Sequence, residues 1–104
     1  MKKSWTGAWW AAALLAGAAT PLQAQDANAA RALAATCFTC HGTDGRSVGG
    51  VPPSIAGQNK TILLQQLKDF KEGKRPATIM HQHAKGYTDA QLEQIAGYFA
   101  AVKP

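Results

Sequence analysis

The sequence of 104 residues has few cysteines, few acidic residues and no clear β-strand pattern, and these shortages narrow the chemistry that the chain can carry. It has only two cysteines, Cys37 and Cys40, and both belong to one C-x-x-C motif, so no thiol remains elsewhere. We find no convincing β-strand pattern, which argues against the βαβ setting of a thioredoxin-like dithiol. Acidic residues are also few, with six Asp and Glu against 11 Lys and Arg. The chemistry of the chain is therefore concentrated around its two thiols.

The first 24 residues have the features of a secretory signal peptide. Lys2 and Lys3 form a basic start, Trp9–Ala19 is an unbroken run of small and apolar residues, and Pro21–Ala24 resembles a cleavage region. The apolar run is too short to span a bilayer readily. We therefore predict a signal peptide at 1–24, cleavage near Ala24, export to the periplasm and no membrane span after cleavage. A retained membrane anchor is the alternative.

The two thiols open a run, Cys37 to His41, that reads C-F-T-C-H. This is the C-x-x-C-H signature of c-type haem attachment. On one helical turn both sulfurs can form thioethers with the haem vinyl groups, while the adjacent imidazole is carried under the ring to bind iron. Two alternatives are a dithiol redox pair and a zinc site built from Cys37, Cys40, His81 and His83. Neither explains the histidine that directly follows the second cysteine.

Cleavage near Ala24 would leave residues 25–104 as one domain of 80 residues. A domain of this size gains little stability from its own apolar core, so a covalently held haem would serve as the centre of that core. The formal net charge of the whole chain is +5, and it falls to +3 without Lys2 and Lys3. Two ionised haem propionates would reduce it to about +1, so the basic composition does not indicate nucleic-acid binding.

Three stretches show the periodicity of amphipathic helices. Asp26 can cap a first helix that leads to the haem motif. A second helix is predicted over 60–72, with Leu63, Leu67 and Phe70 on its apolar stripe, Ile62 broadening that stripe and Gly73 as a stop.

The third predicted helix begins after Thr88, which forms a capping box with Gln91. Leu92, Ile95, Phe99 and Val102 give this helix one apolar stripe. Gly97 lies within it, and glycine is unfavourable in a helix. We therefore expect a close crossing at Gly97, with the first helix as the neighbour.

Two predicted loops separate these helices. The first, 42–59, is rich in Gly, Ser and Pro, and we expect it to line one haem edge and to offer a backbone carbonyl to the free imidazole nitrogen of His41. The second, 75–86, holds Met80, the only methionine after Met1. A thioether at the sixth position of the iron would raise the reduction potential and close the iron to other ligands. His81 and His83 compete for the same position.

The second helix also carries a basic flank, made of Lys68, Lys71, Lys74 and Arg75. Such a flank is usually solvated, and docking of an acidic partner is the sharper alternative.

The order of these features resembles the small, single-haem class I cytochromes c. The resemblance implies an all-α fold, in which three main helices and their loops wrap around one covalent haem. It also implies thioether bonds at Cys37 and Cys40 and axial iron ligands at His41 and Met80. Pro53 looks like the family proline whose carbonyl accepts the His41 proton, although adjacent Pro52 is close in register, and Ile55 would belong to the haem pocket.

A narrower resemblance involves Cys40–Gly45, which many other cytochromes share, and three more specific stretches, Ala77–Met80, Ala84–Tyr87 and Ala96–Phe99. They look like the cytochrome subunits of flavocytochrome c sulfide dehydrogenases. This implies a non-catalytic haem subunit for one-electron transfer. Its flavoprotein partner would oxidise sulfide, and a cytochrome or an oxidase would accept the electrons. The alternatives are a freely diffusing periplasmic cytochrome that serves a terminal oxidase or reductase, and a haem enzyme or gas sensor with an open sixth position.

Overall fold

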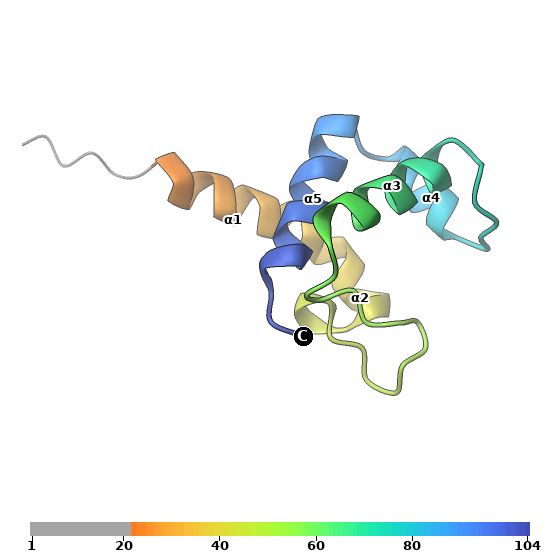
Figure 1. Cartoon of the computed structure of the whole chain (residues 1–104), viewed down its shortest axis with the longest axis horizontal. Coiled ribbons are helices and arrows are strands. Elements are labelled where there is room, and N and C mark those ends of the chain that lie inside the picture. The colour runs from red at the N-terminus through yellow and green to blue at the C-terminus, as the bar shows by residue number, and fades with distance from the viewer. Residues whose placement is uncertain (1–21) are drawn as a thin grey trace, which may run out of the picture.

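The computed structural model describes residues 22–104, with side chains from residue 26 onward (Figure 1). The predicted signal peptide, 1–24, lies outside this part apart from its last three residues. Three main helices are present, with four shorter helical segments between them. The main helices are α1 (Leu22–Ala34), α3 (Lys60–Lys71) and α5 (Asp89–Ala101), and the shorter segments are η1 (Ala35–Cys37), α2 (Phe38–His41), η2 (Thr43–Gly45) and α4 (Met80–Lys85). Because 22–104 contains no strand, the predicted all-α fold is confirmed.

Helix α5 is the centre of the packing (Figure 1). It contacts both α1 and α3, and α3 also contacts α4. The buried cluster between these helices consists of Ala34, Leu63, Ile95, Ala96 and Phe99. Phe38 adds an aromatic edge, with its ring centroid 6.2 Å from that of Tyr98 and 6.1 Å from that of Phe99. Among the helices of 22–104, none has both the length and the apolar character needed to cross a membrane.

The ends of α3 and α5 follow from their capping residues. The predicted capping box of α5 is present, because Gln91 N donates to Thr88 Oγ1 at 3.2 Å and Thr88 N donates to Gln91 Oε1 at 2.9 Å. Helix α3 ends at Lys71, and Gly73 follows with a φ of +73°, as expected of a glycine stop. Its start has a cap that the sequence analysis missed, since Asn59 Oδ1 accepts from Thr61 N and Ile62 N.

Two predictions about the first and second main helices are wrong. Helix α1 begins at Leu22, so Asp26 lies inside the helix and does not cap it. The residues before it, Leu-Gln-Ala-Gln, favour helix and extend it toward the N-terminus. Ile62 is 55% exposed and lies outside the buried stripe that Leu63 enters, because the neighbouring helices cover only one side of α3.

The prediction that a close crossing with α1 explains the glycine at position 97 is also wrong. Helices α1 and α5 do pack together, and the fully buried Ala34 and Ala96 belong to their common cluster. A Cβ added at Gly97 would instead meet Lys60 of α3, 3.7 Å from its Cε, and no atom of the part of α1 with described side chains, 26–34, lies within 4 Å. The close approach of α1 to α5 therefore does not require a glycine at this position.

The segment 75–86 is not a continuous loop as predicted. Helix α4 occupies Met80–Lys85, and Met80 is its first residue. No glycine or proline interrupts 77–85, which permits the helix, while six residues are too few to give a recognisable periodic pattern.

Candidate haem site

One cavity of about 560 Å³ collects every residue that the sequence analysis marks as a site residue. Its wall is mainly apolar. The attachment segment, the first loop and α4 all contribute, and the marked residues on the wall are Cys37, Cys40, His41, Pro53, Ile55 and Met80. The core residues Leu63, Ile95, Ala96 and Phe99 form part of the same wall. The cavity therefore lies directly against the packed centre of the domain.

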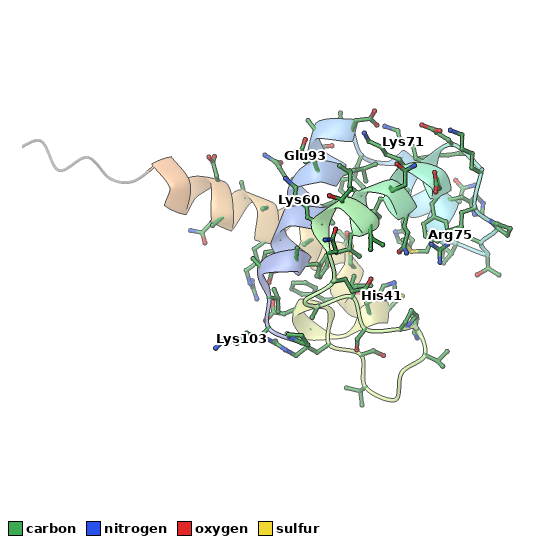
Figure 2. All side chains as sticks on the ribbon, viewed as in Figure 1. His41, Lys60, Lys71, Arg75, Glu93 and Lys103 are labelled. Carbon is green, nitrogen blue, oxygen red and sulfur yellow. The ribbon has the colours of Figure 1, made fainter. Side chains whose placement is uncertain are left out.

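His41 is fixed by a contact with the first loop (Figure 2). Its Nδ1 lies 2.7 Å from the carbonyl oxygen of Pro53. Because a carbonyl can only accept, Nδ1 carries the proton and donates it, which leaves the lone pair of Nε2 available to a metal. The contact involves Pro53 and not Pro52, so the register of the two prolines is resolved.

The two thiols lie on one helical turn. Cys37 and Phe38 both have right-handed helical backbone angles, so η1 runs directly into α2, and residues three apart share a face. Both cysteines are free; Cys37 is half-buried and Cys40 is exposed. Burial raises the pKa of the Cys37 thiol, an effect that the hydrogen bond from Thr36 partly offsets. Two free thiols at this spacing are what thioether attachment requires.

The zinc and dithiol alternatives do not fit this geometry. Among the side chains of 26–104, no group of three or more His, Cys, Asp or Glu residues could hold a metal ion. The four ligands suggested for zinc are therefore not assembled: His83 lines the cavity with both cysteines, but His81 does not. A thioredoxin-like dithiol lacks its sheet, because residues 22–104 form no strand.

Helix α4 begins at Met80, and Tyr87, just after its C-terminal end, connects it to other parts of the domain. The Tyr87 hydroxyl lies 2.5 Å from Thr36 Oγ1, and Lys71 Nζ donates to the Tyr87 carbonyl at 2.8 Å and to Asp89 Oδ1 at 2.9 Å. From the sequence, Lys71 is expected only in the basic flank, and Tyr87 only in one of the stretches of family resemblance. No local signal would reveal this contact, because 51 residues separate Thr36 from Tyr87.

A second network, made of a hydrogen bond and two ion pairs, holds the residues that follow the attachment segment against α1 and α5. Asp44, in η2, accepts a hydrogen bond from the Tyr98 hydroxyl of α5 and lies within 3.7 Å of the guanidinium nitrogens of Arg31 and Arg46. Burial and the Asp44 carboxylate raise the pKa of Tyr98, so the phenol stays protonated and remains a donor. Asp44 thus joins η2 to both α1 and α5.

This donor set fits haem c. The wall offers two free thiols on one turn, an imidazole with an unprotonated Nε2, a thioether and an otherwise mainly apolar lining. A helical domain with this site defines a haem c protein.

The chain belongs to the cytochrome c family, since the family model "Cytochrome c" matches residues 26–103. The predictions of a class I cytochrome c fold and of covalent haem c with iron are thereby confirmed.

Three similar proteins illustrate the range of the family. The cytochrome subunit of sulfide dehydrogenase from Chlorobaculum tepidum is 48% identical over 67 residues, which are 64% of this chain and 60% of that protein. Cytochrome c4 from Pseudomonas aeruginosa is 44% identical over 80 residues, 77% of this chain and 40% of that protein. The structure of Acidithiobacillus ferrooxidans cytochrome c4 matches with a TM-score of 0.68 and 34% identity, over 74% of this chain and 50% of that one. This chain therefore spans 60% or less of each of these three relatives.

Proposed function

We propose that this chain is a periplasmic one-electron carrier whose haem is held by Cys37 and Cys40 and ligated by His41 and Met80. The supporting observation is that all four side chains border one cavity, with the His41 imidazole already oriented by Pro53. When bound, haem iron supplies a ferric–ferrous couple that accepts and releases one electron at a time.

The residues around the site favour such a couple. The Pro53 carbonyl holds the imidazole in a fixed orientation. A thioether from Met80 would raise the reduction potential. The buried side chains of Leu63, Ile95 and Phe99 exclude water from the cavity wall, and a dry wall reduces solvent rearrangement when the charge on the iron changes.

For the electron donor, we favour a sulfide-oxidising flavoprotein. The support is the similarity to the C. tepidum cytochrome subunit of sulfide dehydrogenase, together with the three stretches of narrower resemblance. In this role 1–24 would be removed near Ala24, and 25–104 would form the single haem domain. The substrate chemistry would take place on the flavoprotein, and this chain would pass electrons to a cytochrome or an oxidase.

A freely diffusing carrier that serves a terminal oxidase or reductase is the second candidate. Its support is that cytochrome c4, whose name includes no dehydrogenase, matches a larger share of this chain than the sulfide dehydrogenase subunit does. Both candidates use the same fold and the same iron ligands.

The test is to express the full chain at native level in its host and to purify it from the periplasmic fraction without a tag on any partner. Mass spectrometry would locate the cleavage site, and visible spectra and a flavin assay would be run on the same fraction. Covalent haem that travels with flavin and is reduced by sulfide supports the subunit. Covalent haem without flavin and without a sulfide response supports the diffusing carrier. A chain without covalent haem contradicts both.

A further inference from the structure

Arg75 is the residue of the cavity that the electron-transfer role leaves unexplained. Among the described residues on the cavity wall it is the only one with a permanent charge. In the sequence it belongs to the basic flank with Lys68, Lys71 and Lys74, but none of those three lysines lines the cavity. Arg75 therefore has a position that the rest of the flank does not share.

Two of the flank's lysines, Lys71 and Lys74, have carboxylate partners, whereas Arg75 has none among the described residues. Lys71 Nζ lies 2.9 Å from Asp89 Oδ1, and Lys74 Nζ lies 2.5 Å from Glu72 Oε2. Within the described residues no carboxylate lies within ion-pair distance of the Arg75 guanidinium. The guanidinium carbon instead stacks over the Phe70 ring, 5.0 Å from its centroid. The stacking holds the planar group in place and leaves its N–H groups available.

The group that this cavity takes carries two carboxylates. The propionates of haem c lie on the opposite edge of the ring from the vinyl groups that the cysteines bind. Arg75 comes from the connection between α3 and α4 and not from the attachment segment (Figure 2). A carboxylate against a mainly apolar wall needs a donor, and a guanidinium can give it two parallel hydrogen bonds.

We propose that Arg75 is a positioning residue that binds a haem propionate through its guanidinium and thereby favours the reduced state of the iron. Arg75 is exposed, which places the pair at the mouth of the cavity. A guanidinium that neutralises a propionate makes the potential at the iron more positive, and this favours the addition of an electron. The inference rests on the cofactor of the family and is independent of the electron donor.

The test compares the full-length holoprotein with three variants, each carrying one substitution: Arg75→Gln, Arg75→Lys and Lys74→Gln. The last is the matched control, since it removes one positive charge from the adjacent residue, which does not line the cavity. The readouts are the midpoint potential from a spectroelectrochemical titration and the propionate bending mode in the resonance Raman spectrum. We expect Arg75→Gln to lower the ratio of reduced to oxidised protein at a fixed electrode potential by about two- to fivefold.

The control should change that ratio by less and leave the propionate mode in place, because Lys74 is exposed and its charge is screened by solvent. Arg75→Lys should keep much of the potential but shift the propionate mode, since an ammonium lacks the planar fork. Equal potentials for Arg75→Gln and Lys74→Gln with an unchanged propionate mode would overturn the proposal. If Arg75→Gln fails to assemble, an unchanged propionate mode in Arg75→Lys would overturn it.

Discussion

The two segments on either side of α3, 42–59 and 72–86, serve the same cavity in different ways. The first has no charged residue after Arg46, and no regular secondary structure follows η2. Even so, the backbone N–H groups of Ile55 and Ala56 donate to Gly45 O, at 2.9 and 3.1 Å, and that of Gly57 donates to Phe99 O at 2.8 Å. The second segment is rich in charge and contains α4.

The difference shows that regular structure and firm positioning need not coincide. The irregular segment holds the His41 imidazole through Pro53 and is itself bonded to η2 and α5. The helical segment presents Met80 at the start of a six-residue helix whose N-cap, Ile79, makes no side-chain cap and is 54% exposed. We therefore expect the imidazole side of the iron to resist perturbation and the Met80 side to yield first.

The largest effect should come from removing the anchor that both sides share. In the double variant Cys37→Ser, Cys40→Ser we expect complete loss of covalent haem, because no other thiol exists in the chain. The measurement is a pyridine haemochrome assay after acid–acetone extraction, with circular dichroism for helix content. Covalent haem retained in the double variant would contradict the attachment at these cysteines.

Met80→Ala should have the next largest effect, because it removes the predicted iron ligand on the Met80 side and leaves the His41 side intact. We expect the haem to remain covalently attached, the weak far-red thioether-to-iron band to disappear, the potential to fall and carbon monoxide to bind the ferrous iron. His83→Ala is the matched control, since His83 lies one helical turn away and lines the same cavity. A parent protein without this band, together with carbon monoxide binding in His83→Ala but not in Met80→Ala, would reverse the assignment.

A pair of glycine substitutions compares the two segments directly. A Cβ at Gly42, with φ at +83°, would lie 1.9 Å from the carbonyl oxygen of Arg46, whereas a Cβ at Gly73, with φ at +73°, would meet nothing within 4 Å. We expect Gly42→Ala to lower the free energy of unfolding by about 3 kcal/mol or more and Gly73→Ala by about 1 kcal/mol. Guanidinium unfolding of both holoproteins would measure this, and equal losses would contradict the comparison.

The smallest effect concerns the ion pair between Lys71 and Asp89, near the end of the second segment. The hydrogen bond and charge of Lys71 lower the pKa of the Asp89 carboxyl. The pair therefore stabilises the fold above the ordinary pKa of an aspartate, and its contribution is lost as the pH falls through the lowered value. Asp89→Asn should therefore lower the stability slightly at pH 7, where the pair is intact, and leave it unchanged below the lowered pKa; the loss is small because the pair is at the surface. The measurement is the free energy of unfolding of both proteins between about pH 2 and 7, a range that includes the ordinary pKa of an aspartate.

Much of the fold could be predicted from the sequence because its signals are local. The capping box at Thr88, the glycine stop at Gly73 and the apolar periodicity of α3 and α5 each involve residues within one or two turns. The C-x-x-C-H run is also local, and three residues of the cavity wall could be predicted from it. The proline contact came from a family resemblance, and the structure then distinguished Pro53 from Pro52.

The features that were missed depend on distant or weak signals. Helix α4 is too short to show a period, and the start of α1 has no sharp boundary because the residues before Asp26 favour helix as well. The position of Arg75 on the cavity wall depends on tertiary packing, as does the contact between Thr36 and Tyr87. The Asn59 cap was the exception, since an Asn directly before an apolar helical period is a recognisable signal.

Leu63, Ile95, Ala96 and Phe99 belong both to the buried cluster and to the cavity wall. A chain that has not yet received its cofactor would expose that side of its core to water and open more often. Open chains are cleaved by proteases in proportion to the time they spend open. The steady-state amount of this protein in a cell should therefore follow the supply of haem even when transcription is constant, so that degradation, and not synthesis, removes the copies that cannot carry electrons.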